Sequence, residues 1–196
     1  IVEEKLDGSQ FSFGLINGEL KCKSHYKELI LDAPDKMFEK AVEIVKQLKD
    51  KLTPEWTYRA EYFQKPHHST LTYNRIPNNH LIVFDINTEQ EQYLSYDEKK
   101  KEAERLGLEV VPFLFQGMVN SSEQVKHFLD LESVLGGPKI EGVVLKNYNR
   151  FGRDGKALMG KYVSEKFKER NKVEFRKQNR GDIISRLIAE LKTEAR

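Results

Sequence analysis

The dipeptide Asn17-Gly18 constrains the fold of this chain more than any other short segment. It separates two runs, 11–16 and 19–24, whose residue patterns are those of β-strands. Both Asn and Gly accept the positive φ of a type I′ turn, and Asn-Gly between two such runs is the strongest short signal of a β-hairpin. The chain is therefore expected to begin with antiparallel sheet.

Further along the chain, strand signals alternate with helix signals. A capping box at 95–98 predicts a charged helix that stops at Gly107. After Pro34, an apolar stripe with helical spacing predicts an amphipathic helix; it consists of Phe38, Ala41, Val42, Val45, Leu48 and Leu52. Further strands are expected at 1–6, 56–63, 80–86, 109–115, 141–146 and 158–163, and further helices at 121–131 and 183–191. Hairpins outnumber βαβ units, so the predicted fold class is α+β, with mainly antiparallel sheets flanked by helices.

Composition narrows the class of protein. Of the 196 residues, 38% are hydrophobic and 33% are charged, which indicates a soluble globular chain. No apolar run approaches the roughly 20 residues that span a bilayer, and the charges at 3–5 are unlike a signal peptide. Cys22 is the only cysteine, which favours a reducing, intracellular (cytoplasmic) setting. The net charge is only +2, so any nucleic-acid contact is expected from local patches.

The first cluster with chemical potential is Lys5-Leu6-Asp7-Gly8. Its lysine lies on a predicted strand just before a glycine-containing turn, so its amine is expected at a sheet edge facing a cleft. A lysine amine is a nucleophile once deprotonated, and burial or neighbouring cations favour that form. Taken alone, the tetrapeptide is more typical of an ordinary surface lysine before a turn.

Two further clusters carry charge on predicted strands near the end of the chain. Glu141 begins an apolar strand and Lys146 ends it, whereas Lys161 lies in the last predicted strand. Residues at odd separation on a regular strand face opposite sides, so Glu141 and Lys146 share a face only with a bulge or with the lysine beyond the strand end. A buried strand with ordinary charged ends is the alternative.

The order of these clusters resembles the covalent nucleotidyltransferase superfamily of DNA ligases, RNA ligases and mRNA capping enzymes. Lys5 to Gly8 looks like the nucleophile motif K-x-D-G, and Glu141 to Val144 is similar to E-G-x-V. The segment 58–63, which contains Glu61, resembles the third motif, and 81–86, which contains Phe84 and Asp85, resembles the strand after it. The segment 158–163 is similar to the last motif, K-x-K. Within the superfamily, the chain most resembles the adenylyltransferase domain of nick-sealing, RNA ligase 2-like enzymes that use ATP.

The resemblance implies a role for each matching residue. Lys5 would attack the α-phosphate of ATP, expel pyrophosphate and become lysyl-AMP, and Glu141 would bind Mg²⁺ or Mn²⁺. The other implied contacts to the nucleotide are the backbone of Glu4 and Leu6 to adenine, Phe84 stacked on adenine, Glu61 to the ribose hydroxyls, Lys23 to ribose or phosphate, and Lys146 and Lys161 to the α-phosphate. Mg²⁺ prefers oxygen ligands and is commonly shared between carboxylate, water and substrate phosphate, which fits this set.

Two positions depart from the superfamily pattern. Met159 stands where the last motif often has its first lysine, and Gln10, grouped here with the nucleotide-binding residues, stands where DNA ligases carry arginine. An amide at that position is more like RNA ligases.

The matching motifs end at 163, and the residues that follow are polar and basic. Residues 1–169 are expected to form the nucleotidyltransferase domain, and 170–196 a basic helical segment that begins a truncated C-terminal domain.

The predicted function is an ATP-dependent RNA ligase for RNA repair. It would be a monomer that passes AMP to an RNA 5′-phosphate and seals it to a 3′-hydroxyl, acting on nicked duplexes or RNA ends and on no membrane. The alternatives are a DNA ligase or capping-type core, and an inactive module that only holds nucleotide or RNA. A basic loop with Arg150, Arg153 and Lys156 would either touch a nucleic-acid backbone or be solvated. The charge run 97–105 is predicted to be a solvated helix face.

Overall fold

The computed structural model describes residues 1–172. The chain divides into two compact units, Ile1–Tyr162 and a second that starts at Val163. In the second unit residues 165–172 are helical, and the Ser164 hydroxyl accepts the Phe167 N–H at their start. The helix predicted at 183–191 lies outside the described residues, and the predicted domain boundary at 169 stays a prediction. No helix among the described residues is long and apolar enough to cross a membrane.

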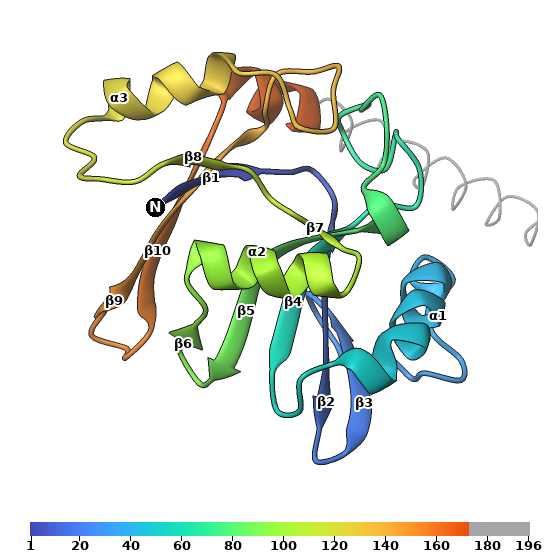
Figure 1. Cartoon of the computed structure of the whole chain (residues 1–196). Coiled ribbons are helices and arrows are strands. Elements are labelled where there is room, and N and C mark those ends of the chain that lie inside the picture. The colour runs from blue at the N-terminus through green and yellow to red at the C-terminus, as the bar shows by residue number, and fades with distance from the viewer. Residues whose placement is uncertain (173–196) are drawn as a thin grey trace, which may run out of the picture. The chain divides into compact units, whose positions relative to one another are not determined.

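The first unit is α+β with two sheets that are almost entirely antiparallel, as predicted (Figure 1). The smaller sheet has the order β10-β9-β1-β8 and the larger one β3-β2-β4-β5-β6, with β7 added in parallel to β5. The strands are β1 (Val2–Lys5), β2 (Ser9–Ile16), β3 (Glu19–Ser24), β4 (Thr57–Tyr62), β5 (Leu81–Glu89), β6 (Gln92–Tyr93), β7 (Glu109–Val110), β8 (Phe113–Phe115), β9 (Gly142–Phe151) and β10 (Ala157–Val163). The α-helices of this unit are α1 (Glu39–Leu48), α2 (Tyr96–Arg105) and α3 (Ser122–Lys126), and short 3₁₀ turns lie at Lys49–Lys51, Asn78–His80 and His127–Asp130.

Two local predictions are confirmed in atomic detail. Asn17 and Gly18 have φ values of 52° and 75°, and they join β2 to β3 with Ile16 opposite Glu19. Helix α2 opens with the full capping box: the Ser95 hydroxyl accepts the Glu98 N–H, and the Glu98 carboxylate accepts the Ser95 N–H.

One face of the larger sheet is apolar and carries the main core. Helices α1 and α2 pack there, through side chains that include Val45 and Ala103, against strand residues such as Phe13, Tyr58 and Val83. Because side chains alternate along a strand, the opposite face of β2, β3 and β4 carries polar residues. We call this opposite side the polar face, and it is where the resemblance places several nucleotide contacts.

Three expectations about elements are corrected. The strand predicted at 109–115 is two short strands in different sheets, because Pro112 has no N–H for a continuous ladder. The helix predicted at 121–131 is α3 followed by a 3₁₀ turn. The helix predicted after Pro34 begins only at Glu39, because residues 36–38 form a turn.

Candidate active site

Lys5 lies at the end of β1, where the chain passes from the smaller sheet to the larger one. Its Nζ is 2.7 Å from Glu141 Oε1 and 2.8 Å from Glu141 Oε2. The side chain of Lys5 is 24% exposed, whereas that of Glu141 is 5% exposed. The pair therefore presents an amine that solvent and a substrate can reach, held by a carboxylate that they hardly reach.

The strand register explains how Glu141 reaches Lys5. Lys5 is paired with Gly142, the first residue of β9, and Glu141 immediately precedes that strand. The sequence left open a lysine beyond the end of the strand. In the structure Lys146 lies within β9, and it is Glu141 that lies outside the strand. Glu141 and Lys146 consequently serve different groups of side chains.

Asp7 and Gly8 of the nucleophile motif fix the chain just after Lys5. The Asp7 carboxylate accepts the backbone N–H groups of Thr70 and Leu71, both at 2.7 Å, and the Asp7 N–H donates to the Tyr73 hydroxyl. A Cβ at Gly8 would lie 2.9 Å from two ring atoms of Phe63, so glycine permits this close approach to β4. The Asp-Gly pair thus positions Lys5 through backbone contacts.

Glu61 is the second carboxylate near Lys5. It lies on β4 directly opposite Gln10 of β2, on the polar face. Burial raises the pKa of Glu61 to about 8, although the charge of Lys5 opposes the rise. Burial likewise raises the pKa of Glu141 to about 7, and Lys5 again opposes the rise. Two carboxylates with raised pKa values close to one lysine are an unfavourable arrangement of a kind that is common at functional sites.

The raised pKa of Glu61 predicts a pH-dependent cost to stability. Since the folded value is about 8 and the ordinary value 4.5, the contribution of Glu61 to stability is fully present below pH 4.5 and is lost as the pH rises to about 8. Glu61→Gln is neutral throughout, so it should unfold at a higher temperature than the wild type at about pH 8.5, by roughly 2–4 °C for each kcal/mol relieved. The difference should shrink toward about pH 5.

Thermal unfolding of both proteins across this pH range is the measurement. Glu39→Gln, which removes an exposed carboxylate from α1, serves as the control and should show no such trend. A Glu61→Gln midpoint at or below that of the wild type at high pH would contradict the assignment of a buried, destabilised carboxylate.

The other predicted nucleotide contacts lie on or near the polar face. Lys23 is exposed and stands opposite Ser12, one step along the sheet from the pair of Gln10 with Glu61. The Gln10 amide oxygen is 2.8 Å from a ring nitrogen of His25. Lys161 on β10 is exposed, and its charge lowers the pKa of Glu141, which places it in the electrostatic field of the Lys5 pair.

Lys146 belongs to a closed, buried network beneath this site. Its Nζ donates to Glu3 at 2.7 Å, to Asp85 at 3.0 Å and to the Phe84 carbonyl at 2.7 Å. Lys99 of α2 donates to the other Glu3 oxygen at 2.6 Å and to the same carbonyl at 2.8 Å. Two ammonium groups thus balance two carboxylates. Breaking one such buried pair typically costs about 3–5 kcal/mol, so the network ties both sheets and α2 together.

Lys99 corrects the prediction that 97–105 is only a solvated helix face. Its side chain is 1% exposed, and burial together with the charge of Lys146 lowers its pKa to about 8. A signal for this existed in the sequence, because Lys99 stands four positions before Ala103 and seven before Leu106, which are both buried. That spacing places Lys99 on the apolar stripe of α2.

Phe84 and Glu4 are placed by backbone irregularities and loop contacts. Arg59 pairs with Asp85 and Ala60 with Val83, so Phe84 is the extra residue of a β-bulge in β5, and it is half-buried. The Glu4 backbone N–H donates to the Pro112 carbonyl, and its buried carboxylate accepts the Ser133 hydroxyl at 2.6 Å. Leu6 is buried.

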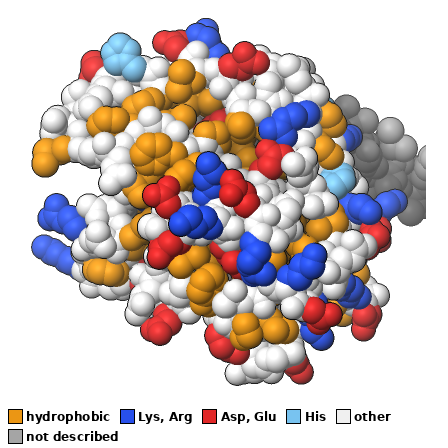
Figure 2. Space-filling model, in the orientation of Figure 1, with side chains coloured by type: hydrophobic (Ala, Val, Ile, Leu, Met, Phe, Trp, Pro, Cys, Tyr) orange, Lys and Arg blue, Asp and Glu red, His pale blue; other side chains and the backbone are white. Residues whose placement is uncertain are grey.

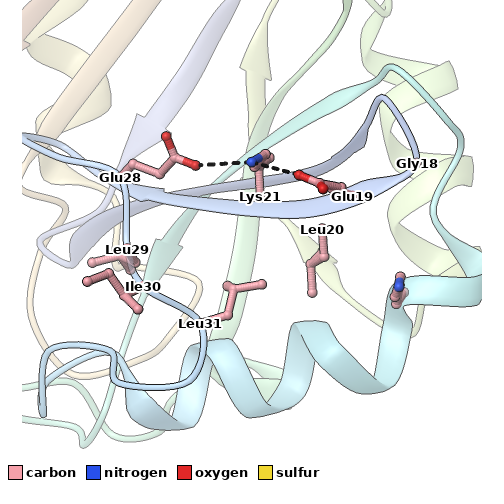
Figure 3. A pocket seen from close by; sticks show the side chains of 9 residues that line it. Gly18, Glu19, Leu20, Lys21, Glu28, Leu29, Ile30 and Leu31 are labelled. Atoms are coloured by element: carbon pink, nitrogen blue, oxygen red, sulfur yellow. Dashed lines mark ion pairs between the residues drawn. The ribbon is translucent and has the colours of Figure 1, made fainter.

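One cavity in the described part of the chain lies away from this site. It measures about 580 Å³ and lies between the β2–β3 hairpin, the segment 28–31 and the end of α1 (Figure 3). Lys21 crosses its upper edge in ion pairs with Glu19 and Glu28. None of the residues predicted to bind nucleotide lines this cavity. We therefore do not assign it to the candidate active site.

A divalent metal fits the site only if its coordination is shared between the protein, water and the substrate. Within residues 1–172 no group of three or more His, Cys, Asp and Glu side chains is arranged to hold a metal ion. Glu141 supplies the carboxylate that is ion-paired with Lys5, and Glu61 lies near enough to interact with Lys5 electrostatically. A cation bound by one protein carboxylate and completed by water and substrate phosphate is the usual arrangement for Mg²⁺ at phosphoryl-transfer sites.

Comparisons with known proteins agree with the fold and the motifs. The RNA ligase family model matches residues 1–163. The sequence matches no curated protein. Among solved structures, Naegleria gruberi RNA ligase with PPi is similar with a TM-score of 0.67 and 22% identity, over 87% of this chain and 51% of that chain. A variant of the same enzyme with ATP and Mn gives 0.68 and 21%, over 87% and 50%. The chain therefore spans about half the length of these structures, and at this identity the likeness shows a shared adenylation fold.

Proposed function

Because the chain belongs to the RNA ligase family, we propose that it is the catalytic domain of an ATP-dependent RNA ligase, with Lys5 as the nucleophile. The observation that carries the proposal is the Lys5–Glu141 pair, in which an amine whose side chain is about one quarter exposed is held by a buried carboxylate at the junction of two sheets. This is the arrangement expected of an amine that must be oriented toward a substrate and released from its counter-ion before it reacts.

In the first step the deprotonated Lys5 amine attacks the α-phosphorus of ATP. A nitrogen–phosphorus bond forms, the bond to the bridging oxygen breaks, and pyrophosphate leaves with that electron pair. A divalent metal held by Glu141 would supply charge neutralisation at the phosphates. Lys161 neutralises the α-phosphate, Glu61 with its high pKa binds the ribose hydroxyls, and Lys23 binds ribose or phosphate from the polar face.

Lys146 is proposed to act on the phosphate from within its network. In the structure all of its donors are engaged by Glu3, Asp85 and Phe84. A direct contact with the α-phosphate therefore requires it to leave at least one carboxylate. Lys99 then remains paired with Glu3, and the Tyr148 hydroxyl still donates to Asp85.

The later steps are proposed from the family and concern RNA. AMP passes from Lys5 to an RNA 5′-phosphate, and a 3′-hydroxyl displaces it to seal the strand. The solved structures of Naegleria gruberi RNA ligase include one with ATP and Mn and one with PPi, which match the substrate, the metal and the leaving group of this scheme.

The test compares nicked duplexes that differ only in the strand carrying the 3′-hydroxyl. With ATP and Mg²⁺, AMP transfer and sealing should be faster when that strand is RNA than when it is DNA, since an A-form duplex is recognised through its shape and its 2′-hydroxyls. Equal rates would favour a DNA ligase. Labelling of the protein by GTP in place of ATP would favour a capping-type enzyme.

A further inference from the structure

The hairpin formed by β9 and β10 extends beyond the sheet to which it belongs. β9 runs from Gly142 to Phe151, but it pairs with β1 only from Gly142 to Leu145. Beyond that point β9 has β10 as its strand neighbour, and the two continue as a two-stranded ribbon (Figure 1, lower left). The base of this ribbon contains Lys146 and Lys161, so the ribbon leads outward from the candidate active site.

Specific contacts hold the ribbon in place. The Tyr148 ring stacks on Tyr93 of β6, with centroids 4.8 Å apart and planes 14° apart. The Tyr148 hydroxyl donates to Asp85 at 2.5 Å, and the Ala157 N–H donates to the Glu91 carboxylate at 2.9 Å. These contacts attach the ribbon to the β5–β6 hairpin, so its far end is presented at a fixed distance from Lys5.

The far end of the ribbon is basic and carries an exposed aromatic ring. We define the ribbon tip as Arg150, Phe151, Arg153 and Lys156. All four residues are exposed, with Phe151 at 54%. No ion pair among the described residues involves the three cations. Basic side chains project at this edge of the molecule (Figure 2).

The ribbon tip differs from the other charged surface of the unit. Several exposed lysines and arginines elsewhere have an acidic partner, as Lys40 has Glu43 and Lys126 has Glu123. At the tip the nearby acid Asp154 accepts the backbone N–H of Lys156. Three cations without carboxylate partners, on a ribbon that is anchored by the contacts of Tyr148 and Ala157, are complementary to a chain of phosphates. Each phosphate contact gains free energy by releasing counter-ions.

We propose that the ribbon tip binds the phosphate backbone of the RNA strand whose 5′-phosphate lies at Lys5. This rests on the proposed function and adds to it the surface that holds the substrate. The three cations contact successive phosphates, and Phe151 packs against a base or sugar exposed at the break, because aromatic rings stack on unpaired bases. Lys161 at the base of the ribbon and the three cations of the tip then contact the same strand at two separate places.

The test uses the full chain and a nicked RNA duplex with a 5′-phosphate, titrated by fluorescence anisotropy over a range of salt concentrations. The variant Arg150→Ala/Arg153→Ala/Lys156→Ala should bind at least about 10-fold more weakly at low salt. Its plot of log affinity against log salt should be shallower by about 2 to 3, since each lost phosphate contact removes about one unit of slope. Its uptake of AMP from ATP should equal that of the wild type, because the tip is not in the nucleotide site.

The control removes the same charge elsewhere. Lys36→Ala/Lys49→Ala/Lys51→Ala changes three exposed lysines near α1, which have no ion pair among the described residues. It should bind RNA nearly as the wild type does. Arg150→Lys/Arg153→Lys keeps the tip cationic and should restore most of the salt dependence.

Three results would overturn the ribbon proposal: unchanged binding by the tip variant, equal loss in the control, or no measurable binding by the wild type at low salt. Failure of the proposed function would give a different result. The wild-type protein would then take up no AMP from ATP, but it could still bind RNA in a way that depends on the ribbon tip. A tip variant that unfolds would be recognised by lost AMP uptake, and the lysine variant would then decide the question.

Discussion

Lys5→Arg is expected to abolish the uptake of AMP from ATP while leaving the fold intact. Arginine keeps a positive charge beside the buried Glu141, so the ion pair that holds the end of β1 survives the change. The guanidinium stays protonated at any usable pH and has no free electron pair to attack phosphorus. The loss would therefore report on nucleophilicity alone. Lys5→Ala should be equally inactive, and it should also be less stable because it leaves Glu141 without its cation.

Intact mass after incubation with ATP and Mg²⁺ measures the uptake, and thermal unfolding checks the fold. Lys21→Arg is the matched control, since it makes the same replacement at an exposed position of β3 and should label fully. Labelling of the Lys5→Arg protein at another lysine would remove Lys5 from the mechanism.

The second large effect is expected from Glu141→Gln. Glutamine keeps the volume of this buried side chain but has no charge to orient Lys5 or to share a divalent metal with substrate phosphate. The rate of self-adenylylation should fall by at least ~10²-fold, the scale on which single electrostatic contributors to a transition state act. The metal concentration needed for half-maximal rate should rise as well.

The measurement is the rate of AMP uptake as a function of Mg²⁺ concentration, with Glu39→Gln as a control that removes an exposed carboxylate from α1. If Glu141→Gln retains its rate at saturating Mg²⁺ with an unchanged metal dependence, then Glu141 only holds the fold together.

Local signals in the sequence predicted local structure well. The Asn17-Gly18 turn and the Ser95 capping box depend on a few adjacent residues, and both were confirmed. Their outcome does not depend on what the rest of the chain does, because the hydrogen bonds involved are made within each segment. The split of 109–115 was foreseeable in the same way, from the missing N–H of Pro112.

The positions of the charged residues could be predicted only where the alternation of side chains along a strand decided them. Parity implied that Glu141 and Lys146 could share a face only through an irregularity, but which residue lies outside the strand depends on the pairing of Lys5 with Gly142. The Glu3–Lys99 bond joins residues 96 positions apart on β1 and α2. The residue pattern of β1 or of α2 alone does not reveal that these two residues pair. The position of Lys99 on the apolar stripe of α2 shows only that this buried lysine needs an acidic partner.

Intact mass of the wild-type chain after incubation with ATP and Mg²⁺, followed by mapping of the modified peptide, tests the central claim most directly. The protein is expected to gain the mass of one adenylyl group, which should be attached to Lys5. Added pyrophosphate should remove this group by reversing the step. A protein that stays unmodified under these conditions, or that carries the adenylyl group on another residue, would contradict the assignment of Lys5 as the nucleophile.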